Sequence, residues 1–103
     1  MNLRYRAAAL EDIDAIYAWR SRQSPEVAER IESAIFATID WLAAHPTLGT
    51  KTDEANVRRW PMTDLRYAIF YVVDKDAAVL DVLRIMDGRR LRDLNRSPRG
   101  NGD

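Results

Sequence analysis

Apolar residues recur at helical spacing along the first part of the chain. Leu10, Ile13, Ile16 and Tyr17 lie on one side of a helix that we expect from about Ala8 to Arg22, after a short strand from Leu3 to Arg6. The other side carries the carboxylates of Glu11, Asp12 and Asp14. Acidic side chains on the polar side of an amphipathic helix are most simply interpreted as a solvated surface.

A second helix begins at Ser24-Pro25-Glu26, because serine caps helix starts and proline fits the first helical turn. Its apolar stripe repeats at steps of mainly three and four residues: Val27, Ala28, Ile31, Ala34, Ile35, Thr38, Ile39 and Leu42. His45-Pro46 ends it, since the residue before proline is pushed out of helical geometry. Only Gln23 and Ser24 separate the two helices, which predicts an antiparallel hairpin.

The second half of the chain changes to strand patterns. We expect a loop over residues 46–56 and strands at Val57–Trp60 (ending at Pro61), Tyr67–Val73 and Ala77–Met86. The resulting order, β-α-α-β-β-β, predicts an α+β fold in which the helical hairpin packs on a small, mainly antiparallel sheet. We expect one domain over residues 1–96 and a disordered polar tail over residues 97–103.

Composition excludes several classes of site. The chain of 103 residues has no cysteine and a single histidine, so thiol chemistry and cysteine- or histidine-based metal sites are not expected. We expect no cofactor. No apolar run approaches the length of about 20 residues that a membrane span needs, and the basic start leads into no apolar segment. These features predict a cytoplasmic protein.

Sixteen basic and sixteen acidic residues balance overall, but arginine gathers on the predicted strands and after them. The cluster comprises Arg58, Arg59, Arg66, Arg84, Arg89 and Arg90. Arg84 lies in an otherwise apolar strand, where an unpaired buried cation would be costly. Two interpretations stay open: an ion pair between Arg84 and an acidic residue of the helices, or a cationic groove for an anionic target.

Four segments resemble a known family. They are His45-Pro46-Thr47-Leu48-Gly49, Val57-Arg58-Arg59-Trp60-Pro61, Tyr67-Ala68-Ile69-Phe70-Tyr71 and Leu83 to Arg90. In this order and spacing they are similar to motifs of the ParE/RelE superfamily of type II toxins, over about residues 3–92. The resemblance implies the same order of elements, and the motifs are closest to the ParE-like branch.

Two departures from the family pattern affect the expected activity. Ala68 stands where the family strand usually has arginine, and Asp87 stands where it often has histidine. The resemblance implies that RelE-like members cleave messenger RNA, for which this chain offers only Arg66, Asp87 and Arg90. That acid–base set is incomplete, because a group must take the 2′-hydroxyl proton while cations stabilise the developing charge. An enzyme is therefore the less favoured interpretation.

The ParE-like branch implies toxicity through binding and inhibition of DNA gyrase. The residues expected to contact that target are Trp60, Arg84, Arg89 and Arg90. Such a toxin would be neutralised in a hetero-oligomer with a small ParD-like antitoxin, docking on the helical hairpin through Ile13, Tyr17, Ile31 and Ile35 and on the open sheet edge. A non-toxic module that only binds its antitoxin remains an alternative, and direct nucleic-acid binding stays open.

Overall fold

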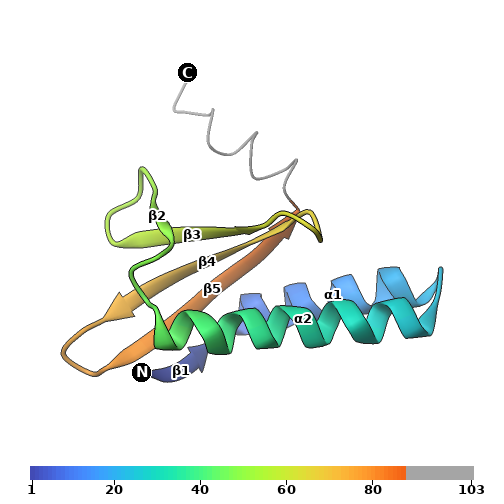
Figure 1. Ribbon diagram of the computed structural model, residues 1–103, viewed down its shortest axis with the longest axis horizontal. Helices are drawn as coiled ribbons and strands as arrows, with labels where there is room; N and C mark the ends of the chain where they lie inside the picture. The colour runs from blue at the N-terminus through green and yellow to red at the C-terminus, as the bar shows by residue number, and fades with distance from the viewer. Residues whose placement is uncertain (88–103) are drawn as a thin grey trace.

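The computed structural model describes residues 1–87 and consists of two helices and a five-stranded sheet (Figure 1). The elements follow one another as β1 (Asn2–Tyr5), α1 (Ala7–Ser21), α2 (Pro25–Ala44), β2 (Thr50–Lys51), β3 (Val57–Met62), β4 (Tyr67–Asp74) and β5 (Val79–Asp87). The predicted order is confirmed, with the two-residue β2 added inside the expected loop. The expected tail, the domain boundary at residue 96, and Arg89 and Arg90 lie outside the described residues.

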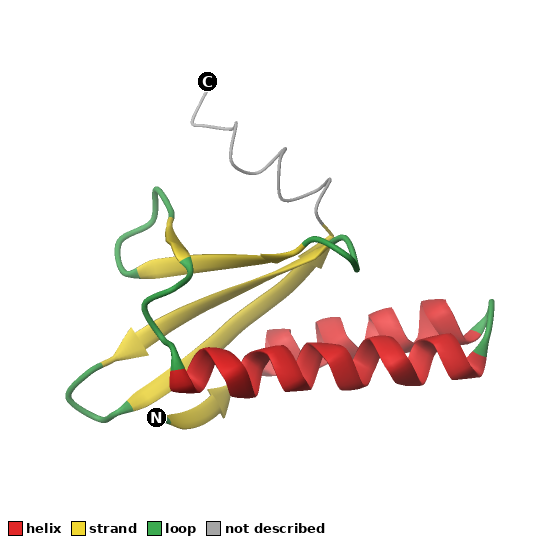
Figure 2. Ribbon diagram, in the orientation of Figure 1, coloured by secondary structure: helices red, strands yellow, loops and turns green. Residues whose placement is uncertain are grey.

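The sheet has the strand order β1-β5-β4-β3-β2. Strands β2 to β5 form an antiparallel meander, while β1 joins the free edge of β5 in parallel. The helical hairpin forms the connection between β1 and the meander, and both helices lie together on one side of the sheet (Figure 2). The other face of the sheet carries no helix in the described part of the chain, and we call it the open face.

The core lies between the hairpin and the sheet. It takes alternate residues of the strands, such as Ile69 and Tyr71 of β4, together with the apolar stripe of each helix. Ile13, Ile31 and Ile35 are buried in this core. Their side chains therefore face the sheet and are not exposed in this conformation, and their expected contact with an antitoxin stays a prediction. Tyr17 is half-buried.

The ends of the helices follow the local signals. The Ser24 hydroxyl accepts a hydrogen bond from the Val27 N–H at 3.3 Å, and Pro25 begins α2. At the other end, His45 leaves helical geometry before Pro46. Neither described helix has the length and apolar content needed to cross a membrane.

Strand β3 passes through Pro61 and ends at Met62, so the predicted end before Pro61 is wrong. The Val57 carbonyl accepts the Thr52 N–H, so residues 57, 59 and 61 direct their backbone groups towards β2. Strand β2 pairs only with Arg58 and Arg59. The N–H that Pro61 lacks would therefore point to an open edge, and no ladder bond to β4 is lost.

The loop between α2 and β2 is fastened by two side chains from the sheet. The buried Tyr71 hydroxyl donates to the Pro46 carbonyl and accepts the Gly49 N–H, both at 2.9 Å. Arg58 Nη1 donates to the carbonyls of Thr47 at 3.1 Å and Gly49 at 2.7 Å. A side chain at Gly49 would meet the Tyr71 ring within 2.9 Å. These contacts give a structural reason for the proline, glycine, arginine and tyrosine of three of the four motifs.

Candidate binding surface on the open face of the sheet

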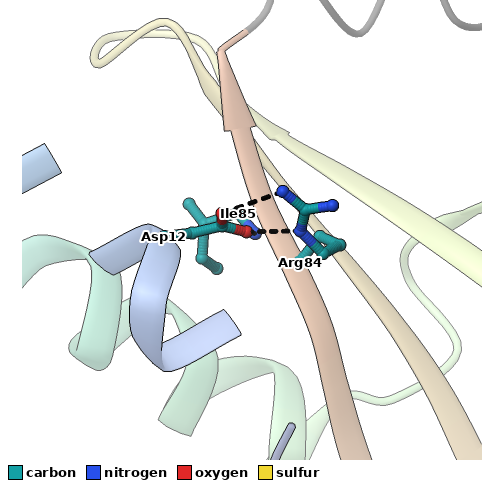
Figure 3. A network of polar contacts seen from close by, with 3 residues as sticks. All are labelled: Asp12, Arg84 and Ile85. Atoms are coloured by element: carbon teal, nitrogen blue, oxygen red, sulfur yellow. Dashed lines mark hydrogen bonds and ion pairs between the residues drawn. The ribbon is translucent and has the colours of Figure 1, made fainter. Parts of the chain in front are cut away.

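Arg84 is held by an acidic side chain of helix α1. Its Nε and Nη2 atoms donate to the two carboxylate oxygens of Asp12 at 2.7 and 2.9 Å (Figure 3). Of the two interpretations of Arg84 that the sequence left open, the ion pair with a helical carboxylate is thus present. The interpretation of Asp12 as a solvated residue is wrong, since its side chain is only 16% exposed, whereas the Arg84 side chain is 45% exposed.

The same carboxylate also completes the sheet edge. Strand β1 pairs with β5 only as far as Tyr5 opposite Val82. Beyond that point the Ile85 N–H donates to Asp12 Oδ2 at 2.9 Å. The hydrogen bond and charge of Asp12 raise the pKa of Arg84 above its ordinary value, so the guanidinium remains a cation. Asp12 therefore joins α1 to β5 and fixes the direction in which Arg84 is presented.

A row of three residues crosses the open face. Arg59 of β3 lies opposite Phe70 of β4, and Phe70 lies opposite Arg84 of β5. Residues that face each other across antiparallel strands share one face of the sheet. We call Arg59, Phe70 and Arg84 the cross-strand row. Arg59 Nε is buried without a hydrogen-bond acceptor, and Phe70 is half-buried.

A bulge in β5 helps to set which side chains belong to this face. The register changes between Phe70, which faces Arg84, and Tyr71, which faces Val82, so Leu83 is the extra residue. Leu80 and Val82 point into the core before the bulge, and Ile85 does so after it. Arg84 is consequently left on the open face without disturbing the buried positions on either side.

Trp60 is not part of the row. It lies opposite Ile69, a core residue, and its ring packs on Trp41 of α2 with 5.1 Å between ring centroids. Trp41 in turn contacts the ring of His45, 4.9 Å away. Trp60 therefore faces the helices, and the structure does not bring it together with Arg84 as the expected target surface required. Arg89 and Arg90, the other two members of that set, are outside residues 1–87.

Arg66 and Asp87 are brought to one end of the sheet. Arg66 lies in the turn between β3 and β4 with a positive φ of 65°, and its N–H donates to the Met62 carbonyl. The next residue, Tyr67, is the register partner of Asp87 at the end of β5. Two members of the nuclease set thus lie near each other, while Arg90 lies outside the described residues.

Within residues 1–87, no tyrosine or histidine side chain stands on the open face. Tyr67 and Tyr71 are buried on the helix side, where the Tyr67 hydroxyl accepts a bond from Arg20 Nε at 3.1 Å. Burial raises the pKa of Tyr71, which opposes any role as a base. Tyr5 packs edge-on against Phe36 of α2, and Tyr17 belongs to α1. His45 caps α2 beside Trp41.

The open face also holds a buried carboxylate that the sequence did not single out. Asp81 is 3% exposed and accepts from Arg6 Nε at 2.8 Å, with Arg4 Nε at 3.6 Å. Arg4 is its register partner on β1. This ion pair ties β1 to β5. The signal was an acidic residue in an apolar strand, but its partner became visible only with the parallel pairing.

One family model matches most of the chain. Residues 3–92 match the family model described as "ParE toxin of type II toxin-antitoxin system, parDE". A relative from Sinorhizobium fredii (strain NBRC 101917 / NGR234), named "Putative toxin Y4kP", is 28% identical over 81 residues, which is 79% of this chain and 84% of the relative. The matched residues make up most of the chain, and all four motifs lie within them.

Solved structures share the fold. A chain of the chromosomal ParDE system from P. aeruginosa superposes with a TM-score of 0.74 and 23% identity, covering 84% of this chain and 95% of that one. The isolated E. coli RelE toxin gives a TM-score of 0.59 and 12% identity, covering 92% and 96%. A chain of the intact E. coli RelBE toxin–antitoxin complex gives 0.58 and 12%, covering 84% and 94%.

Proposed function

Because the chain belongs to the ParE toxin family of type II toxin–antitoxin systems, we propose that it binds and inhibits DNA gyrase and is neutralised by a ParD-like antitoxin. The observation that carries the proposal is the open face itself. It presents arginine side chains, while the tyrosine and histidine side chains of residues 1–87 lie elsewhere. Such a surface suits binding, since RNA cleavage needs a positioned acid and base. The site of action would be the cytoplasm.

The target surface is proposed to centre on Arg84, with Arg89 and Arg90 following it in the chain. Arg84 is presented by Asp12 with its guanidinium partly exposed. Trp60 is dropped from this surface, because its ring packs against Trp41 on the side of the helices. A fixed guanidinium loses less conformational entropy on binding than a freely moving one, which favours its use as a contact.

The antitoxin is proposed to dock on the outer side of the hairpin. Leu10 of α1 is 44% exposed, and the half-buried Tyr17, two helical turns further on, lies on the same side of the helix. An amphipathic or extended segment that covers these residues would hide apolar surface from water. This assignment replaces the buried Ile13, Ile31 and Ile35 with neighbours that a partner can reach.

The test is a DNA supercoiling assay with gyrase and the purified chain, alongside induced expression in cells. Inhibited supercoiling, growth arrest and a DNA-damage response are expected. Exchange of Arg84, or of the Arg89/Arg90 pair, for alanine should reduce these effects while antitoxin binding survives. Arg30→Ala on the exposed surface of α2 is the matched control. Unimpaired supercoiling together with growth arrest would overturn gyrase as the target.

A second candidate is a RelE-like mRNA endonuclease, favoured by one observation. Arg66 and Asp87 lie at the same end of the sheet, and Arg90 is the third residue after Asp87 in the sequence. Cut transcripts and rapid loss of protein synthesis after induction, abolished by Asp87→Asn, would support this candidate. If induction causes no arrest but the chain still captures its antitoxin, the chain is a non-toxic binding module.

A further inference from the structure

Arg59 differs from the other arginines of the described strands. Arg4 pairs with Asp81, Arg58 donates to loop carbonyls, and Arg84 pairs with Asp12. Within residues 1–87, Arg59 makes no ion pair, and its Nε atom is buried without an acceptor. A buried N–H donor such as this one is costly to leave without an acceptor, and another molecule that reaches the guanidinium could supply one.

The surroundings of Arg59 define what that acceptor can be. Phe70 lies beside it and Arg84 beyond Phe70. Strands are about 4.8 Å apart, so the Cα atoms of Arg59 and Arg84 are separated by roughly 10 Å across the ring. Arg84 already binds a carboxylate in a two-bond geometry, which shows the chemistry that a guanidinium of this row accepts.

As far as residues 1–87 form it, the same face is poorly suited to nucleic acid. Single-stranded RNA is usually bound by several cations along the backbone and by exposed aromatic rings on which bases stack. Here Arg84 and Arg4 are neutralised by Asp12 and Asp81, and Trp60 is turned towards the helices. One unpaired cation next to a half-buried phenyl ring instead matches a carboxylate beside an apolar side chain.

We infer that Arg59, with Phe70 and Arg84 beside it, is the seat for an acidic side chain in an extended peptide segment of a protein partner. The segment's carboxylate would bind Arg59, and a neighbouring apolar side chain would cover Phe70. In one respect the inference rests on the proposed function, since it assumes that the open face meets a protein. It adds Arg59 and the acidic character of the contacting segment.

The test uses the full chain of 103 residues and a fluorescein-labelled synthetic peptide of alternating leucine and glutamate, with fluorescence anisotropy as the readout. The control peptide carries glutamine in place of every glutamate. We expect Arg59→Gln to weaken binding of the glutamate peptide about tenfold or more, as for loss of a charge-assisted hydrogen bond. Arg30→Gln, the same change on exposed α2, should leave binding unchanged.

Three results would overturn the inference: no binding of the glutamate peptide, equal binding of the glutamine peptide, or equal loss in the Arg59 and Arg30 variants. A short single-stranded RNA serves as competitor. If it displaces the peptide more strongly than salt of equal ionic strength, the open face is a nucleic-acid surface. The assay contains no gyrase, so failure of gyrase inhibition and failure of the peptide seat are separate outcomes.

Discussion

Asp12 and Arg84 are 72 positions apart in the chain, yet they form a two-bond ion pair at the edge of the sheet, and Asp12 also accepts the N–H of the next residue, Ile85. One carboxylate therefore accepts a backbone hydrogen bond from β5 beyond the end of β1, where no strand is present to do so. It also neutralises a cation on β5 and ties α1 to that strand. Three bonds to one side chain make Asp12 a structural residue at the border of the open face and link the hairpin to the strand that carries Arg84.

The first prediction separates these roles of Asp12. Asp12→Asn keeps an oxygen acceptor for Ile85 but removes the charge, and should lower the free energy of unfolding by about 1 kcal/mol, because Arg84 is partly exposed and screened. Asp12→Ala also leaves the Ile85 N–H unsatisfied and should cost about 2–3 kcal/mol. Urea unfolding measures both. Asp14→Asn on the exposed side of α1 is the control, and equal losses in all three variants would contradict the assignment.

A second prediction concerns pH and Tyr71. Burial raises the pKa of this phenol in the folded state, with opposing but smaller effects from Gly49 and Arg58. The folded state then holds the proton more tightly than the unfolded state. The stabilisation is fully present below the ordinary tyrosine pKa of about 10 and is lost as pH rises from there through the raised value.

The measurement is urea unfolding at several pH values between neutrality and the alkaline limit of the assay. Tyr71→Phe should be less stable at neutral pH by about 1–3 kcal/mol, since it leaves the Gly49 N–H and the Pro46 carbonyl without their partner. Its stability should also decline less steeply above pH 10. Tyr5, whose pKa is raised by burial and by Asp40, keeps a residual slope in the variant. An identical slope in both proteins would contradict the prediction.

The third prediction tests why glycine stands at position 49. A Cβ atom there would lie within 2.9 Å of the Tyr71 ring, whose other side is packed in the core. Gly49→Ala should therefore cost about 1–3 kcal/mol, typical of overpacking. Gly100→Ala in the C-terminal tail, where no core contact is expected from the sequence, is the comparison. A melting temperature that is unchanged by Gly49→Ala would show that the loop moves away from Tyr71 at no cost.

The hydrophobic pattern was sufficient to predict the helices and strands, but it did not predict which side chains lie on the open face of the sheet. The stripe of α2 and the apolar run of β4 identified the core, because each has a clear period. In β3, however, Val57 and Trp60 lie at positions of opposite parity, so the alternation did not say which face is buried. Arg58 ended up on the helix side because its guanidinium finds loop carbonyls there, which leaves Arg59 on the open face.

The hydrophobic pattern also could not predict which residues far apart in the sequence form contacts. The parallel pairing of β1 with β5 decides that Asp81 meets Arg4 and Arg6, and the end of β1 decides that Asp12 meets Ile85. Both depend on where a four-residue strand stops, which composition and periodicity do not specify. The bulge at Leu83 is a further local feature of the backbone that the sequence pattern did not predict.

The fourth prediction concerns the buried pair of β1 and β5. Asp81→Asn should lower the free energy of unfolding by about 1–2 kcal/mol, less than a fully buried pair, because Arg6 is largely exposed. Arg6→Gln should cost less than Asp81→Asn, since Arg4 remains near the carboxylate. Hydrogen exchange of β1 amides would show whether the loss is local to that strand. A larger cost for Arg6→Gln than for Asp81→Asn would contradict this account.

The last prediction sets stability against binding at Arg59. Its Nε atom is buried without an acceptor, so Arg59→Gln or Arg59→Leu removes an unsatisfied donor and should leave the free energy of unfolding unchanged or raise it by up to about 1 kcal/mol. The same variants should no longer cause growth arrest if Arg59 contacts the toxin's target protein. Residues kept at a cost in stability are typical of binding sites, and a scaffold residue would show the opposite combination. Chemical unfolding and induced expression of the same variants give the two readouts. A destabilised variant that retains full toxicity would assign Arg59 to the fold and remove it from the binding surface.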